Sequence, residues 1–247
     1  TEHMYANDKI LLGITGTDIP MQESEDGNIV VFEVANRLFS YDVISNRLAV
    51  IFSFYDAENA DWRTVYDQHS IKILNVDEGG NIQFAVYGYM NRGRHEGEVG
   101  VQVYTYNSSL NTVEELIYIP VDTTYSVLSA ELKQLLYLNR DGQLYLQLNN
   151  VVYGIDLVEK RVIQVANIIR SGSLQVSDNH KIMIWPEGED LYQSQALNIR
   201  NLNNNVRKVV TTAPGEAILP LGFMEEDIIY GVARTEDVVR ENSGRVL

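Results

Sequence analysis

The chain has 247 residues, of which 45% are hydrophobic and 21% are charged. These proportions are typical of a folded globular protein and exclude wholesale disorder. The net charge of −15 disfavours nucleic acid and anionic membrane surfaces as partners, and the absence of cysteine excludes disulfides and cysteine-based metal sites. No apolar run approaches the roughly 18 residues that a membrane-spanning helix needs, so we expect no membrane insertion.

Short runs rich in β-branched and aromatic residues, separated by polar turns, recur along the chain and predict β-strands. The first predicted unit contains strands at residues 10–14, 29–34, 38–43 and 47–54. A polar insert at 55–68 leads to a second unit with strands at 71–76, 82–89, 99–106 and 113–119. Helical periodicity is weak, and its strongest instance, Val113 to Leu116, is too short for a helix.

The same arrangement continues through the second half of the chain. The third unit is predicted at 125–129, 134–138, 143–148 and a hairpin at 151–165. The fourth contains a short strand, a polar turn and a second strand within 174–185, followed by strands at 196–200 and 206–210. A fifth unit begins with strands at 217–223 and 227–232 and then passes into a charged tail at 234–247. The approximate blades are therefore residues 8–55, 70–120, 124–167, 172–212 and a partial 216–247, which we expect to form a single domain.

Direct comparison of two segments supports the repeat. Residues 38–48 align without a gap on residues 152–162, so that Asp42 matches Asp156 and Arg47 matches Arg161. An aspartate at this place can accept hydrogen bonds from backbone N–H groups in the following turn, which would fix the hairpin. The corresponding turns near Asn107, Asp156 and Arg200 give a period of about 40 to 50 residues, which is typical of the four-stranded blades of a β-propeller.

The segment Val176 to Trp185 resembles the blade motif of TolB-like periplasmic propellers, in which a Ser-Pro-Asp-Gly-type turn leads into a Lys-Ile-Ala-Phe-type strand. This chain lacks the proline and has Asn179 in place of the glycine. Gly222 to Tyr230 resembles the same opening in another blade. The resemblance implies a fold and no particular reaction.

The predicted fold class is therefore all-β, a β-propeller of four-stranded antiparallel blades with about four complete blades and a partial fifth. A propeller closes by pairing its first and last strands, which hides the edges of its sheets. Either the run Ile10 to Ile14 completes the last blade, or the chain is a fragment of a larger propeller. We favour the fragment.

The most unusual local feature is the segment Asn91 to Glu98, which contains Arg92, Arg94, His95 and Glu96 between glycines in an otherwise acidic chain. Arginine binds planar anionic groups through two N–H donors, so this loop is a candidate recognition site for an anionic ligand or a partner's carboxylates. The alternative is a solvated hairpin in which Glu96 and Glu98 neutralise the arginines, as exposed loops often do.

A weaker candidate pocket is formed by Trp62, Arg63 and His69, in which the indole would stack on a sugar or peptide. A tryptophan in such a linker more often packs over the end of a sheet. We predict no metal site, because His180 has no histidine nearby in sequence and because turn chemistry explains Asp77 and Asp141. No cofactor or catalytic residue is predicted, since nucleophile-elbow, dinucleotide and phosphate-loop motifs are absent.

These observations favour a non-catalytic propeller that presents loops for recognition of a protein, the cell surface or the cell wall, including carbohydrate. The alternatives are a propeller-type hydrolase or glycosidase that uses a pair of carboxylates, and the propeller module of a larger peptidase. We expect an extracytoplasmic location from the resemblance, with a cytoplasmic one as the alternative. The sequence leaves the oligomeric state open.

Overall fold

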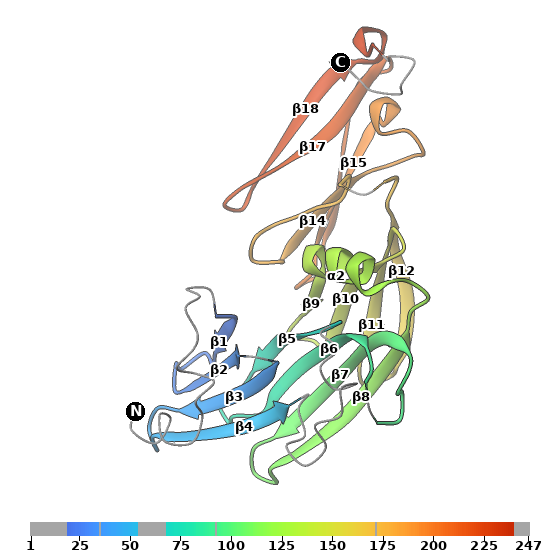
Figure 1. The fold of residues 1–247 in the computed structure, drawn as a ribbon. Helices are drawn as coiled ribbons and strands as arrows, with labels where there is room; N and C mark the ends of the chain where they lie inside the picture. Colours follow the sequence, from blue (N-terminus) through green and yellow to red (C-terminus); the bar gives the residue numbers. More distant parts are fainter. Residues whose placement is uncertain (1–18, 35, 54–67, 92, 171, 240–247) are drawn as a thin grey trace. The chain divides into compact units, whose positions relative to one another are not determined.

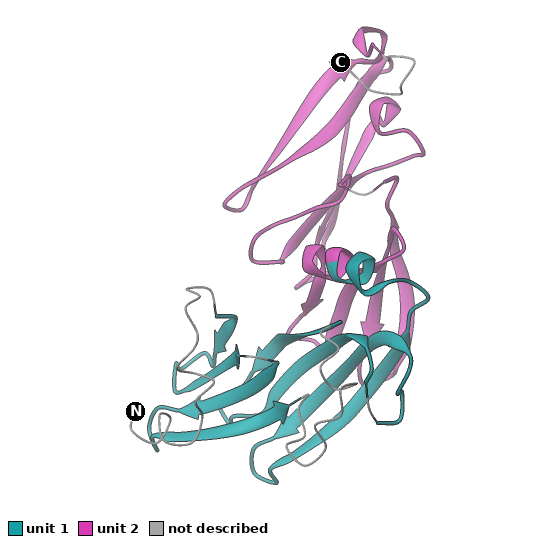
Figure 2. Ribbon diagram, viewed as in Figure 1, with its two compact units in different colours: residues 1–129 teal, residues 130–247 magenta. Residues whose placement is uncertain are grey.

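The computed structural model describes residues 19–34, 36–53, 68–91, 93–170 and 172–239, which form antiparallel sheets and one α-helix, α2 (Figure 1). The chain divides into two compact units, residues 1–129 and 130–247 (Figure 2). None of the described helices is long and apolar enough to cross a membrane.

The first unit contains two four-stranded antiparallel sheets, in each of which the strands follow chain order. Blade 1 consists of β1 (Met21–Glu23), β2 (Ile29–Val34), β3 (Arg37–Asp42) and β4 (Arg47–Ser53). Blade 2 consists of β5 (His69–Val76), β6 (Ile82–Tyr89), β7 (Val99–Asn107) and β8 (Thr112–Pro120).

The second unit contains two further four-stranded sheets and one two-stranded sheet. Blade 3 consists of β9 (Leu136–Leu138), β10 (Gln143–Leu148), β11 (Val151–Asp156) and β12 (Arg161–Asn167). Blade 4 consists of β13 (Gln175–Val176), β14 (Ile182–Pro186), β15 (Ala196–Asn201) and β16 (Arg207–Thr211), with the 3₁₀ turn η3 (Leu191–Gln193) between β14 and β15. The last sheet pairs β17 (Glu216–Met224) with β18 (Asp227–Arg234), and η4 (Thr235–Asp237) follows.

These sheets confirm the predicted all-β class, with four complete four-stranded units and a partial fifth among the described residues. The single-domain organisation stays a prediction. The predicted strand at 10–14 lies outside the described residues, and the first described strand is the short β1, which the sequence analysis missed.

The turn between the third and fourth strands of the blades has the predicted chemistry. In blade 1, Asp42 Oδ1 accepts hydrogen bonds from the backbone N–H groups of Ile44 and Ser45 at 2.9 and 3.0 Å. In blade 3, Asp156 Oδ1 accepts from Val158 and Glu159, both at 2.9 Å. The predicted pairs are also in register, because Asp42 lies opposite Arg47 and Asp156 lies opposite Arg161. The repeat is therefore built on one local hydrogen-bond pattern.

The turn between the first and second strands is also shared by two blades. Ser24 Oγ donates to Asp26 Oδ1 at 2.6 Å and accepts from the N–H of Ile29 at 3.0 Å. Ser177 Oγ donates to Asn179 Oδ1 at 2.8 Å and accepts from the N–H of Ile182 at 3.0 Å. The serine of the TolB-like motif therefore fixes this turn, and Asn179 takes the place of the motif's aspartate. The alignment of Asn179 with the motif's glycine is wrong by one residue, because His180, with a φ of 56°, stands where blade 1 has Gly27, with a φ of 71°.

Each unit has its own apolar core between adjacent sheets. In the first unit, Val31 and Leu38 of blade 1 pack in one cluster with Ile82 and Phe84 of blade 2, and all four are fully buried. In the second unit, one cluster contains residues of blades 3 and 4, and another contains residues of blade 4 and the β17–β18 sheet. Burial of each large side chain contributes about 1.5–3 kcal/mol.

The alternation of residues along the strands predicts Phe84, Val86, Leu136, Ile182, Ile184 and Ile229 as packing residues. Four of these are buried, namely Phe84, Val86, Leu136 and Ile184, and Ile182 is half-buried against the cluster that contains Ile184. The prediction is wrong for Ile229, which is 39% exposed. Its neighbour Ile228 is the residue of β18 that packs against blade 4.

The predicted strand at 125–129 is wrong, because these residues belong to the helix α2 (Tyr125–Gln134). The predicted strand at 134–138 is confirmed only over its last three residues, as the short β9. The helix follows from leucines at positions 128, 132 and 135, which recur at helical spacing and are fully buried. Glu131 of this helix accepts hydrogen bonds from the backbone N–H groups of Asn149 and Asn150, so the helix also supports the β10–β11 turn.

Candidate functional site

The predicted recognition loop connects β6 to β7 and is closed at its base by backbone hydrogen bonds. The N–H of Met90 donates to the carbonyl of Glu98, and the N–H of Gly97 donates to the carbonyl of Met90, both at 2.8 Å. Gly93 and Gly97 have φ values of 82° and 91°, a left-handed region that glycine adopts without strain. The loop therefore has a defined backbone at its base, built on two glycine turns.

His95 anchors this loop to β8. Its imidazole stacks on the Tyr118 ring, with the ring centroids 3.6 Å apart and the planes 18° from parallel. Nε2 lies 3.3 Å from Glu115 Oε1, and Nδ1 lies 3.7 Å from Glu98 Oε2. The side chain is only 13% exposed. Both ring nitrogens therefore face carboxylates, and one ring face is covered by an aromatic side chain.

The neighbours of His95 are themselves held in place. Gln102 of β7 donates a hydrogen bond from Nε2 to Glu115 Oε2 at 3.0 Å. Burial, a hydrogen bond to Glu98 and the negative charges of Glu98 and Glu115 raise the pKa of Tyr118. The phenol therefore remains protonated well above neutral pH, and it can continue to donate a hydrogen bond beside two carboxylates.

Gly100 makes room for this cluster. A Cβ atom at this position would lie 2.6 Å from the Tyr118 ring and 2.6 Å from the carbonyl oxygen of Ile119. Because a backbone carbonyl cannot move aside easily, only glycine fits here without displacing the strand or the ring.

The tip of the loop points charged side chains to solvent. Arg94 and Glu96 are exposed, and Arg94 forms no ion pair with any described residue. The carboxylate of Glu98 approaches His95 Nδ1 at 3.7 Å, and the alternative in which Glu96 and Glu98 neutralise the arginines stays a prediction. Arg92, the other predicted member, lies outside the described residues.

The weaker candidate pocket is only partly described. Trp62 and Arg63 lie outside the described residues, and the pocket stays a prediction. His69 belongs to β5, is 4% exposed and lies opposite Gly88 of β6.

No group of three or more histidine, aspartate or glutamate residues among the described parts of the chain could hold a metal ion. His180 lies in the β13–β14 turn, where its φ of 56° and a contact from Nδ1 to the carbonyl of Asp178 at 3.1 Å fit a turn residue.

Tyr118, Glu115 and Gln102 are the residues of this cluster that sequence reasoning missed. Glu115 and Tyr118 lie on β8, distant from the loop in sequence, whereas Gln102 lies on β7 shortly after it. The only signal was the aromatic and polar character of these strands. A β-bulge between Val103 and Tyr104 shifts the pairing of β7 with β8, so no simple alternation predicts which side chains face His95.

Comparison with known proteins gives no family for this chain. No family model matches the chain, and no curated protein matches it. Among solved structures, the chain is similar to TolB from Acinetobacter baumannii, at 14% identity and a TM-score of 0.43, over 81% of this chain and 44% of TolB. It is also similar to Porphyromonas gingivalis dipeptidyl peptidase 4, at 12% identity and a TM-score of 0.41, over 91% of this chain and 37% of the peptidase.

A third similar structure is the extracellular domain of a one-component system from B. thetaiotaomicron, at 11% identity and a TM-score of 0.37, over 89% of this chain and 27% of that domain. The chain thus spans less than half the length of each of these three proteins. The resemblance to TolB-like propellers is confirmed at the level of the fold alone.

Proposed function

We propose that this chain is a non-catalytic recognition module of the propeller type, and that the β6–β7 loop of blade 2 docks a partner protein. In this proposal the exposed guanidinium of Arg94 binds a carboxylate on the partner. The proposal includes an extracytoplasmic location, which the TolB-like motif at Val176 to Trp185 supports.

The observation that carries the proposal is that two neighbouring residues of this loop differ in their contacts. His95 is fixed between Tyr118, Glu98 and Glu115, whereas Arg94, its neighbour in sequence, is exposed and unpaired among the described residues. Anchoring a loop before binding reduces the entropy that is lost when a partner docks. The contacts of His95 therefore order the loop before a partner binds to Arg94.

The same geometry supports a binding role over a catalytic one. A general base needs a free lone pair directed at the substrate. In His95 both ring nitrogens lie within 4 Å of a carboxylate oxygen, at 3.3 and 3.7 Å. The carboxylates of Glu98 and Glu115 are likewise directed at the imidazole.

The chemistry of Arg94 defines the kind of partner. A guanidinium presents two parallel N–H donors that match the two oxygens of a carboxylate. The chain as a whole carries a net charge of −15, so an acidic partner is repelled at most orientations and attracted only where an arginine is presented. The contrast between the acidic chain and the exposed Arg94 favours docking in one orientation.

The test is site-specific photo-cross-linking. A photo-cross-linking amino acid replaces Glu96, which is exposed beside Arg94, and captured partners are identified by mass spectrometry. The capture is repeated with Arg94→Ala, and with Arg207→Ala as a matched control, since Arg207 is also an exposed arginine but lies on β16. We expect one partner to be lost with Arg94→Ala and retained with Arg207→Ala. An identical set of captured proteins in all three samples would contradict the proposal.

A further inference from the structure

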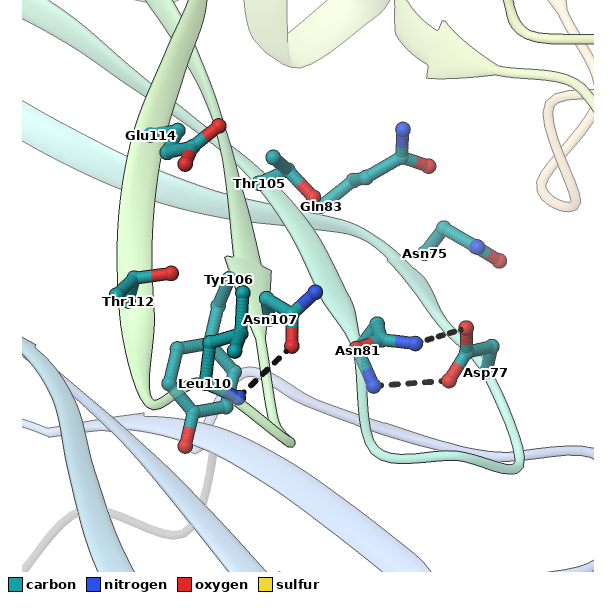
Figure 3. A pocket seen from close by; sticks show the side chains of 10 residues that line it. All are labelled: Asn75, Asp77, Asn81, Gln83, Thr105, Tyr106, Asn107, Leu110, Thr112 and Glu114. Carbon is teal, nitrogen blue, oxygen red and sulfur yellow. Dashed lines mark hydrogen bonds between the residues drawn. The ribbon is translucent and has the colours of Figure 1, made fainter.

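A polar groove of about 330 Å³ lies on blade 2 beside the β5–β6 and β7–β8 turns, which are at the opposite ends of β6 and β7 from the His95 loop. Figure 3 shows the side chains that line it. Side chains from all four strands of the blade line it. The groove belongs entirely to the first unit.

One row of side chains crosses the floor of this groove. Asn75 lies opposite Gln83, Gln83 lies opposite Thr105, and Thr105 lies opposite Glu114, so each strand contributes one polar residue. Neighbouring strands are about 4.8 Å apart, which makes the row about 14 Å long. A β-bulge between Ile73 and Asn75 shifts the pairing of β5 with β6, so that Asn75 lies opposite Gln83. Asn75 faces solvent, and Leu74 and Val76 on either side of it are buried.

The side chains of the row do not contribute hydrogen bonds or ion pairs to the described fold. Asn75, Gln83, Thr105 and Glu114, together with Thr112 at the rim, make no side-chain hydrogen bond or ion pair with any described residue. The walls differ in this respect. Asp77 accepts hydrogen bonds from the backbone and side-chain nitrogens of Asn81 at 2.8 and 2.9 Å, and Asn107 accepts from the N–H of Leu110 at 3.0 Å (Figure 3).

The charge of the lining limits the ligand. No lysine, arginine or histidine lines the groove, and its two acidic residues are Asp77 and Glu114. Phosphate, sulfate and carboxylate ligands would meet negative charge without a compensating cation. Amides and hydroxyls both donate and accept hydrogen bonds, and so do the hydroxyls of a sugar. Leu110, which is 69% exposed, supplies an apolar contact at the edge.

We propose that this groove is a second binding site, and that its ligand is a chain of neutral sugars. The row of amide, hydroxyl and carboxylate groups runs across the strands and matches an extended ligand with regularly spaced hydroxyls. The hydrogen bonds of Asp77 and Asn107 already fix the walls, so little conformational entropy is lost in the walls on binding. This site is independent of the proposed docking loop.

The test is a nuclear magnetic resonance titration of the isotope-labelled chain with three probes, cellohexaose, maltohexaose and chitohexaose. We expect at least one of them to cause saturable shifts at the backbone amides of Gln83 and Thr105. The Gln83→Ala/Thr105→Ala variant should bind that probe at least about tenfold more weakly, because two hydrogen-bonding groups are removed. Gln22→Ala/Thr211→Ala is the matched control, since both residues lie on strands outside the groove, and it should bind like the wild type.

Glu114→Gln separates a neutral ligand from a cationic one. The variant keeps the shape and hydrogen-bonding capacity of the side chain but removes its charge, so the probe sugar should bind within about threefold of the wild type. Tetralysine serves as the cationic probe. Three outcomes would overturn the proposal: no sugar shifts the groove amides, the Gln83→Ala/Thr105→Ala variant binds the sugar as tightly as the wild type, or tetralysine alone binds and loses its affinity with Glu114→Gln.

Discussion

The imidazole of His95 lies nearly parallel to the phenol ring of Tyr118, with 3.6 Å between the ring centroids. This contact joins the β6–β7 loop to the edge strand β8. Glu98 and Glu115 approach the two nitrogens of the same imidazole. The conformation of the loop is thereby tied to side chains of the sheet.

The glycine beneath this stack offers a direct test. Gly100→Ala should displace the Tyr118 ring, because the new Cβ would lie 2.6 Å from it and 2.6 Å from the carbonyl of Ile119. We expect a loss of about 1–3 kcal/mol in the free energy of unfolding, measured with urea, together with a changed chemical shift for the His95 ring protons. Gly231→Ala is the control, because there the nearest atom to the added Cβ is 3.6 Å away, on a leucine side chain. Equal stability of the two variants would show that the cluster tolerates displacement.

The raised pKa of Tyr118 predicts an alkaline effect. A tyrosine in the unfolded chain ionises near pH 10, whereas burial and the hydrogen bond to Glu98 keep the folded phenol protonated to higher pH. The folded state therefore binds this proton more tightly, and stability is lost as the pH rises above about 10. Tyr118→Phe should reduce the loss of melting temperature between about pH 8 and about pH 11. Tyr230→Phe, at a position that is 44% exposed, should leave it unchanged. An unaltered loss in Tyr118→Phe would show that this phenol has no linkage to folding.

The turn aspartates predict the opposite dependence at acidic pH. Backbone hydrogen bonds lower the pKa values of Asp42 and Asp156, first from Ser45 and Glu159 respectively. Their stabilising effect is therefore present above the unfolded value near 3.9 and is lost as the pH falls below it. Asp42→Ala and Asp156→Ala should each lower the melting temperature at neutral pH, and the difference from the wild type should shrink toward about pH 3. A difference that persists undiminished at acidic pH would mean that the charge is not what holds the turn.

Packing between blade 4 and the β17–β18 sheet gives a prediction with a magnitude. Ile184 is fully buried and packs with Leu197 and Ile218. Ile184→Ala should reduce the free energy of unfolding by about 2–5 kcal/mol, measured by urea denaturation. Ile229→Ala, at a position that is 39% exposed, should cost less than about 1 kcal/mol. A larger effect at Ile229 would reverse the assignment of the faces of β18.

Local chemistry explains why the fold could be predicted from the sequence. Asp42 and Asp156 bond to N–H groups only two and three residues ahead, so a short alignment identifies the turn in both blades. The helix α2 was missed because its buried leucines, such as Leu128 and Leu132, lie in a segment that also contains β-branched and aromatic residues. This segment therefore fits both a helical and a strand pattern, and it forms a helix because the helix buries its leucines.

The candidate site was predictable only for residues of the loop itself. The composition of the loop identifies Arg94 and His95, because charged residues between glycines are visible in the sequence. The stack on Tyr118 depends on strand pairing across β7 and β8 and on the bulge after Val103. Registers of this kind are set by the tertiary structure, and no local pattern encodes them.

The central claim is that Arg94 binds a partner through a loop that His95 holds in place. Its most direct test is calorimetric titration of the partner captured by photo-cross-linking into the wild type, Arg94→Ala, Arg94→Lys and Arg207→Ala at low ionic strength, where charge effects are largest. We expect Arg94→Ala to bind at least about tenfold more weakly, Arg94→Lys to be intermediate because it keeps the charge without the paired donors, and Arg207→Ala to match the wild type. Equal affinity of Arg94→Ala and the wild type under these conditions would contradict the claim.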